Sequence, residues 1–295
     1  MKKVIISCAI AFVGLTASAV TPLWLRDVMI SPDGKSIAFT YKGDIYTVPV
    51  SGGTATRLTT QPTYETSPVW SPDSKSIAFT SDRNGNFDIF IMPATGGTAK
   101  RLTTNSANEI PQTFTPDGKF VVFSASIQDP VKSVQFPSSR YTELYKVPLT
   151  GGRTEQITAA VVEMPSYSKD GSWMVYQDNK GMENEWRKHH TSSVTRDIWK
   201  YDIKAGTYTN LTNRGGEDRN PVLSEDNKTV YFLSERDGKS MNVYSFDISV
   251  PSKVTQITNF KTNPVRFLSR AANVLWLSAT MAKYTLLAPV IRFQR

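Results

Sequence analysis

The sequence has few of the residues that enzymes use for nucleophilic or metal chemistry. In 295 residues it has one cysteine, Cys8, and two histidines, which are adjacent at positions 189 and 190. A single cysteine excludes an internal disulfide framework. No G-x-S-x-G pattern occurs, and no Gly-rich phosphate loop follows a strand to open a helix. The sequence therefore predicts no catalytic residue, no metal site and no cofactor.

Long apolar runs are also absent beyond the N-terminus. Lys2 and Lys3 precede the apolar stretch "VIISCAIAFVGLTA", and "ASA" follows at 17–19. This order is typical of a secretory signal peptide, so residues 1–19 are predicted to be cleaved after Ala19. The alternative is a membrane anchor, although the run is short for a bilayer. We expect a periplasmic or secreted protein with no membrane-spanning segment after cleavage.

Neither sign of charge forms a block. The chain has 34 Lys and Arg against 26 Asp and Glu, which gives a formal net charge of +8. Because the basic residues are scattered among acidic ones, the sequence does not indicate a nucleic-acid partner.

The dominant feature of the sequence is a repeat. The turn "SPDGK" (31–35) recurs as "SPDSK" (71–75), "TPDGK" (115–119), "SKDGS" (168–172) and "SEDNK" (224–228). Two short β-type runs follow each turn, for example "SIAFT" and "DIYTVPV" in the first copy. Each copy then closes on "RLT", "QIT" or "NLT".

This pattern predicts about four antiparallel strands in each copy. Pro, Asp and Gly favour tight turns, and the β-branched and aromatic runs between them favour strands. A lone four-stranded sheet cannot bury both faces, whereas sheets stacked around an axis can. We therefore expect an all-β protein, a β-propeller of four-stranded antiparallel blades. Five copies are readable over 20–263, and residues 264–295 form a partial or damaged sixth.

The stretch "PVWSPDSKSIAFTSDRNGNFDIFIMPATGGTAKRLT" (68–103) resembles the repeat of the Tol-system periplasmic propeller and of tricorn-type peptidases. With its interrupted fourth copy, the chain most resembles the N-terminal propeller of exported tricorn-like serine peptidases. That resemblance implies a polypeptide-binding or gating role. It also implies a peptidase domain downstream, related to C-terminal processing peptidases, which these 295 residues do not contain.

The repeat pattern fails after "NPVRFLS" (263–269). With permitted codons, residues 278–284 can be read in another frame as G-Y-D-G-E-I-Y, which resembles "TYKGDIY" at 40–46. We favour an out-of-frame tail over coincidence, and the gene sequence decides between them.

The candidate binding surface comes from the two longest connections within blades, 127–141 and 179–196. Long loops in compact domains are usually functional or disordered. Because strands alternate in direction, both loops are expected on one face of the ring. The candidate binding residues are as follows: Arg140, Glu183, Glu185, Trp186, Arg187, Lys188, His189, His190 and Arg196.

These residues suit a peptide, since Arg and Lys bind carboxylates and Trp binds an apolar side chain. A solvated polar loop is the simpler interpretation. A metal is disfavoured because adjacent histidines on an extended strand point in opposite directions. The segment "DRNGNFD" (82–88) resembles a calcium loop but lacks the distal Glu, so a hairpin turn is favoured.

The sequence thus predicts a non-catalytic module for a polypeptide or peptide ligand. Two alternative functions are compatible with the sequence. One is a Tol-type scaffold that binds envelope proteins, although that family has a small α/β domain before its propeller. The other is a propeller hydrolase, which would need acidic residues that converge around the channel.

Overall fold

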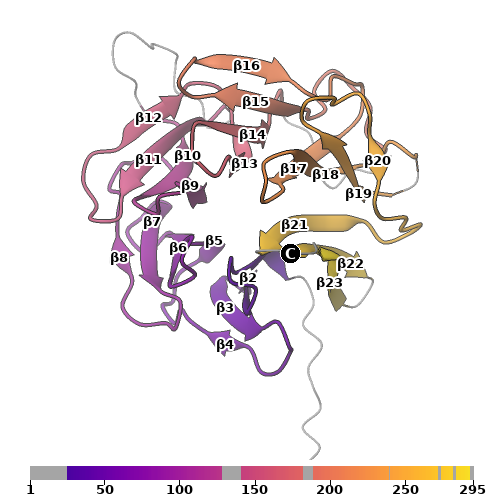
Figure 1. Ribbon diagram of the computed structural model, residues 1–295. Coiled ribbons are helices and arrows are strands. Elements are labelled where there is room, and N and C mark those ends of the chain that lie inside the picture. The colour runs from indigo at the N-terminus through magenta and orange to yellow at the C-terminus, as the bar shows by residue number, and fades with distance from the viewer. Residues whose placement is uncertain are drawn as a thin grey trace, which may run out of the picture.

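The computed structural model describes residues 25–127, 141–181, 189–238, 240–271, 274–281 and 284–292, the last two ranges by their backbone pairing. All regular elements in these ranges are strands. They form five four-stranded sheets and one three-stranded sheet, each antiparallel and each built from consecutive strands. Figure 1 shows the sheets following one another around a common axis, with the first strand of each sheet innermost. The predicted all-β propeller is therefore confirmed.

The first three blades cover the most regular copies of the repeat. Blade 1 contains β1 (Arg26–Ile30), β2 (Ser36–Tyr41), β3 (Asp44–Pro49) and β4 (Thr56–Arg57). Blade 2 contains β5 (Glu65–Trp70), β6 (Ser76–Ser81), β7 (Asp88–Pro93) and β8 (Lys100–Arg101). Blade 3 contains β9 (Glu109–Phe114), β10 (Phe120–Ala125), β11 (Glu143–Pro148) and β12 (Glu155–Thr158).

The last three blades include the sheet in which the sequence pattern fails. Blade 4 contains β13 (Glu163–Tyr167), β14 (Trp173–Gln177), β15 (Ile198–Asp202) and β16 (Thr207–Asn210). Blade 5 contains β17 (Asp218–Leu223), β18 (Thr229–Ser234), β19 (Asn242–Asp247) and β20 (Thr255–Gln256). Blade 6 contains β21 (Val265–Ala271), β22 (Val274–Met281) and β23 (Tyr284–Arg292). Blade 6 has three strands in the described residues. In the ranges described, no helix is present that could carry the chain across a membrane.

The core is divided among the boundaries between blades. Six clusters of buried apolar side chains are found in the described residues, and each joins two neighbouring blades. Between blades 1 and 2, for instance, Trp70 and Phe79 pack with Ile45. Between blades 6 and 1, Ala271 packs with Val28 and Ile30, which closes the ring. Packing against both neighbours gives each small sheet the burial that it lacks alone.

The repeated Ser-Pro-Asp-Gly turn is held by its own side chains. In the second copy, Ser71 donates its hydroxyl to Asp73 Oδ1 at 2.6 Å, and the same carboxylate accepts the N–H of Lys75 at 3.1 Å. The hydroxyl oxygen of Ser71 also accepts the N–H of Ser76 at 2.9 Å. The fourth turn position has positive φ, 73° at Gly34 and 61° at Asn227, which favours Gly or Asn there. We call the side of the ring with these turns the turn face, and the opposite side the loop face.

The "DIY" and "RLT" segments meet in a buried polar corner at the loop face. In blade 1, Thr59 donates its hydroxyl to Asp44 Oδ1 at 3.2 Å and accepts the N–H of Ile45 at 3.0 Å. Arg57 pairs with Asp44 at 2.8 Å. These contacts fix the outermost strand to the third strand and explain the pairing of an acid, or Asn242 in the fifth copy, with a Thr. A buried carboxylate needs such partners.

Candidate functional site: the axial pocket and the loop face

The innermost strands border a pocket on the axis of the propeller, with a volume of about 100 Å³. Each innermost strand has a β-bulge, as the pairing register of β1, β5, β9, β13, β17 and β21 shows. At four of these bulges the residue has φ between 50° and 55°, namely Asp27, Ser67, Met164 and Asn220. Non-glycine residues rarely adopt this conformation, and where they do it is often part of a functional site.

Polar side chains at these bulges hold neighbouring blades together. Asp27 Oδ2 accepts the hydroxyl of Thr66 at 2.7 Å and the N–H of Ser67 at 3.2 Å. Gln112 Oε1 accepts the N–H of Met164 at 2.9 Å. These bonds join blade 1 to blade 2 and blade 3 to blade 4.

Asn220 uses both ends of its side-chain amide in the same way between blades 5 and 6. Its Oδ1 accepts the N–H of Leu268 at 2.9 Å, and its Nδ2 donates to the carbonyl of Leu268 at 3.2 Å. Hydrogen bonds from the adjacent blade thus fix the positive-φ residues that border the axial pocket. We call this set of bulge residues and their partners the polar frame.

Apolar side chains are exposed within this frame. Ile110 and Met164 are 43% and 41% exposed, and both line the axial pocket beside Val69 and Phe267. An apolar surface surrounded by fixed hydrogen-bonding groups is the usual composition of a ligand site.

Most of the predicted binding residues lie outside the described part of the chain. This applies to the following: Arg140, Glu183, Glu185, Trp186, Arg187 and Lys188. His189, His190 and Arg196 are described, and all three lie at the loop face between blades 4 and 5.

His190 and Arg196 are buried, at 4% and 7% exposure, and so face the protein more than solvent. His190 Nδ1 lies 3.3 Å from Glu217 Oε1, and its Nε2 lies 2.9 Å from Ser192 Oγ. Arg196 Nε donates to Glu163 Oε2 at 3.3 Å. These contacts tie the loop to blades 4 and 5.

The chain Ser192, His190, Glu217 has the order of a proton relay, in which a carboxylate orients a histidine toward a hydroxyl. Ser192 Oγ also accepts the N–H of Val194 at 3.2 Å, which is a local turn contact. The same geometry therefore serves to close the loop.

The two histidines do not converge on one point. His189 Nδ1 lies 3.8 Å from Glu235 Oε2, while His190 faces Glu217. In the residues that the structure describes, no group of three or more metal-ligating side chains occurs.

The segment 82–88 leads from β6 into β7, and its side chains form hydrogen bonds and ion pairs within blade 2. Asp82 Oδ1 accepts the N–H of Tyr64 at 2.8 Å. Arg83 pairs with Glu65 at 3.0 Å and lies 4.5 Å from the centre of the Phe90 ring. Blade 5 repeats this arrangement with Arg236, which pairs with Asp218 at 2.7 Å.

Sequence reasoning missed the axial residues. Their signal was present, since an X-Pro pair stands four and three residues before the turn serine in three copies, as Ser67-Pro68, Met164-Pro165 and Asn220-Pro221. Within sheets, proline is confined to edge strands, strand starts and bulges. The bulge residues could therefore have been predicted to depart from regular strand geometry.

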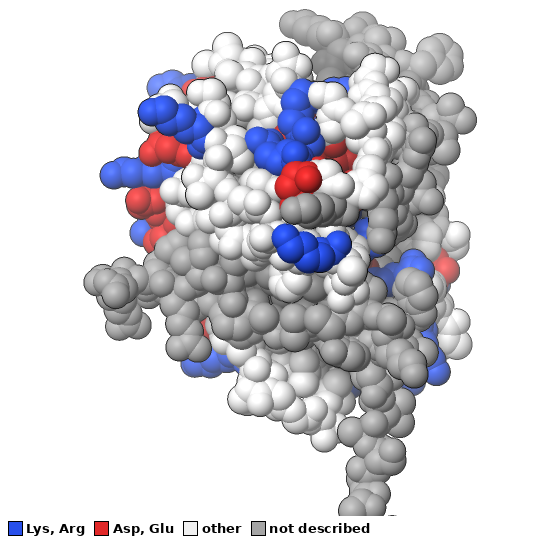
Figure 2. Space-filling view, turned by 90° about the vertical axis from the view of Figure 1, so that its right-hand side faces the viewer, with Lys and Arg blue, Asp and Glu red and all other residues white. Residues whose placement is uncertain are grey.

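Charged side chains at the surface are intermixed. On the described part of the face in Figure 2, basic and acidic side chains lie next to one another. Among the described residues, Lys169 pairs with Glu225 at 3.3 Å, and Arg270 pairs with the same carboxylate. Such pairs reduce the field of one sign that each charge would produce alone.

The stacked four-stranded sheets, the bulged innermost strands and the axial pocket define a β-propeller with a central pocket. Residues 22–281 match the model of the family described as the tricorn protease N-terminal beta propeller domain, and the chain belongs to that family.

Solved structures share the fold at low sequence identity. The crystal structure of the tricorn protease has a TM-score of 0.71 at 18% identity, over 93% of this chain and 27% of that one. TolB from Acinetobacter baumannii has a TM-score of 0.60 at 20% identity, over 89% of this chain and 65% of that one. Putative TolB from Agrobacterium tumefaciens has a TM-score of 0.58 at 17% identity, over 91% and 80%.

One curated relative is similar in sequence over part of its length. The uncharacterized peptidase YuxL of Bacillus subtilis (strain 168) is 32% identical over 91 residues, which are 30% of this chain and 13% of that protein. This chain therefore matches a small part of a larger relative.

Proposed function

We propose that this propeller is a non-catalytic module that binds and gates polypeptide segments, and that it acts after export to the periplasm or the cell exterior. The family to which it belongs is named for a domain of a protease. Because proteases act on polypeptides, this supports a polypeptide as the ligand. The leader-like start of the sequence supports export.

The observation that carries the proposal is the axial pocket, where exposed Ile110 and Met164 lie beside hydrogen-bonding side chains. An extended segment offers backbone groups and apolar side chains in alternation, and it needs both kinds of partner. Because the polar groups are already fixed by neighbouring blades, little entropy is lost when they bind.

The test uses an unfolded polypeptide as the ligand: a second protein that has been reduced, carboxymethylated and labelled with fluorescein. Fluorescence anisotropy measures its binding to the propeller. Replacing Ile110 by Ser is expected to weaken binding about tenfold, since it removes an apolar contact of about 1.5 kcal/mol or more. The matched control is Val250→Ser, an apolar residue that is 39% exposed and lies away from the axis. Equal binding by Ile110→Ser and the unaltered protein would contradict the axial site.

One observation favours a second candidate, a hydrolase. Ser192, His190 and Glu217 form a hydrogen-bonded chain, as nucleophile, base and acid do in hydrolases. Labelling of the protein by a fluorophosphonate, lost in Ser192→Ala, would support this candidate.

A further inference from the structure

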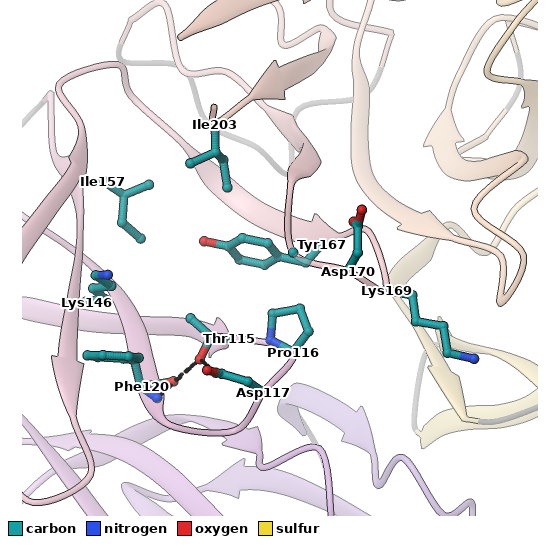
Figure 3. Close-up of a pocket in the computed structure, with 11 residues that line it drawn as sticks. Thr115, Pro116, Asp117, Phe120, Lys146, Ile157, Tyr167, Lys169, Asp170 and Ile203 are labelled. Atoms are coloured by element: carbon teal, nitrogen blue, oxygen red, sulfur yellow. Dashed lines mark hydrogen bonds between the residues drawn. The ribbon is translucent and has the colours of Figure 1, made fainter. Parts of the chain in front are cut away.

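A second pocket lies on the turn face, in the groove between blades 3 and 4, far from the polar corners of the loop face. Its volume is about 410 Å³, four times that of the axial pocket. Figure 3 shows Phe120 and Tyr167 on either side of the groove, with Ile157 and Ile203 at its upper end. The volume lies within the range of small-molecule sites.

The boundary between blades 3 and 4 differs from that between blades 1 and 2 at one position of the repeat. Tyr167 directly precedes the turn serine of its copy, as Trp70 does in blade 2. Trp70 is 7% exposed, packs into the boundary between blades 1 and 2, and donates its Nε1–H to the carbonyl of Met29 at 3.1 Å. Tyr167 is half-buried, and its hydroxyl makes no hydrogen bond to any residue that the structure describes. A polar group so placed is available to a ligand.

Two hydrogen-bond donors converge on one end of the groove. Burial raises the pKa of Tyr167, so its phenol stays neutral and can donate its proton. Lys146 lies 4.6 Å from the centre of the Phe120 ring, and its ammonium pairs with Glu155 at 3.0 Å. An ammonium has three donors, and Glu155 occupies one of them. In Figure 3 the Tyr167 hydroxyl points toward the side of the groove that holds Lys146 and Ile157.

Glu155 is already paired with Lys146, and the two acids that line the groove are engaged in their turns. Asp117 Oδ1 accepts the hydroxyl of Thr115 at 2.6 Å and the N–H of Lys119 at 3.1 Å. Asp170 Oδ1 accepts the hydroxyl of Ser168 at 2.7 Å. Figure 3 shows Asp170 at the end of Tyr167 away from its hydroxyl, Asp117 across the groove beside Thr115 and Phe120, and Lys169 pointing out of the groove. The remaining donors therefore lie at the Lys146 end, where a carboxylate can accept from both, whereas Asp170 disfavours a negative group near the other end.

We propose that this groove binds a small apolar monocarboxylic acid. Its aryl or branched alkyl part lies between Phe120, Tyr167 and Ile203, and its carboxylate accepts hydrogen bonds from Lys146 Nζ and the Tyr167 hydroxyl. Charge-assisted bonds of this kind orient the ligand. The acidic turns select against a second carboxylate. This site is independent of the axial pocket.

The test is isothermal titration calorimetry with indole-3-acetate and, as a neutral analogue, indole-3-acetamide. Indole-3-acetate is expected to bind saturably and at least about tenfold more tightly than the amide, since a charge-assisted bond contributes about 1.5 kcal/mol or more. Lys146→Met is expected to abolish this preference. Tyr167→Phe, which keeps the ring, is expected to weaken acid binding about fivefold and amide binding less.

The matched control is Lys200→Met. Lys200 lies 4.8 Å from the centre of the Trp173 ring in blade 4, as Lys146 lies over Phe120, but apolar side chains including Ile248 and Leu211 fill the boundary there. Acid binding by this variant is expected to match that of the unaltered protein. Equal binding of acid and amide, an unchanged preference in Lys146→Met, or no saturable binding of the acid would overturn the proposal. Circular dichroism verifies that each variant is folded.

Discussion

Replacing Asp218 by Ala is expected to lower the free energy of unfolding by about 3–5 kcal/mol, because it strands two cations in a largely buried site. Asp218 is fully buried at the start of β17. Its Oδ2 accepts from Arg236 at 2.7 Å, and its Oδ1 accepts from Arg214 at 3.3 Å and Ser234 at 2.5 Å. Urea denaturation followed by circular dichroism measures the loss.

A second substitution distinguishes the stranded charge from a simple cavity. Arg236 lies 5.0 Å from the centre of the Phe232 ring, so Met in its place keeps an apolar contact. Adding Arg236→Met to Asp218→Ala is expected to recover part of the stability, since one uncompensated charge disappears. A loss below about 1 kcal/mol for Asp218→Ala, the size of an exposed pair, would show that the site is hydrated and the account of it wrong.

Replacing Glu109 by Gln is expected to stabilise the protein at pH 8 by about 1–3 kcal/mol. Glu109 begins β9 and is fully buried. Burial, with the nearby carboxylate of Asp88, raises its pKa from 4.5 to about 7, while the hydroxyl of Thr103 partly offsets the shift. Its Oε1 has no hydrogen-bond partner in the described residues.

The sign follows from proton linkage. A carboxyl whose pKa is raised in the folded state contributes stability that is present below pH 4.5 and lost as the pH rises through 7. The advantage of Glu109→Gln should therefore be largest at pH 8 and vanish near pH 4.5. Chemical denaturation at a series of pH values provides the measurement, and a difference that stays constant from pH 4.5 to 8 would refute the assignment.

The equivalent residue of blade 2 is the matched control. Glu65 also begins an innermost strand and is fully buried, but Arg83 pairs with it at 3.0 Å and Ser81 donates to it at 2.9 Å. Glu65→Gln is expected to destabilise the protein at pH 8, opposite in sign to Glu109→Gln. The two substitutions differ in sign because Arg83 pairs with Glu65, whereas no ion pair is described for Glu109.

The blades could be predicted from the sequence because each blade repeats the same short-range hydrogen bonds. Asp73 and its equivalents accept bonds from a hydroxyl two residues before them and an N–H two residues after. Such contacts lie within a single turn, so spacing alone reveals them. The contact between Asp44 and Thr59 spans 15 residues, but it stays within one blade and recurs at a nearly fixed spacing, so the sequence reveals it as well.

The binding surfaces could not be predicted in the same way. Gln112 and Met164, which meet on the axis, are 52 residues apart, and Phe120 faces Tyr167 only because two blades pack together. The loops that the sequence singled out are chiefly outside the described residues, and their described members, His190 and Arg196, are buried in contacts with blades 4 and 5. Length and polarity indicate an exposed loop, but they do not show which side chains turn inward.

The proposal that this propeller binds polypeptide without cleaving it can be tested with reduced, carboxymethylated casein. The purified protein is incubated with the casein, the complex is isolated by size exclusion, and the intact mass of the bound casein is determined. We expect retained casein of unchanged mass, and less of it with Ile110→Ser. Casein fragments that disappear with Ser192→Ala, or no retained casein at all, would contradict it.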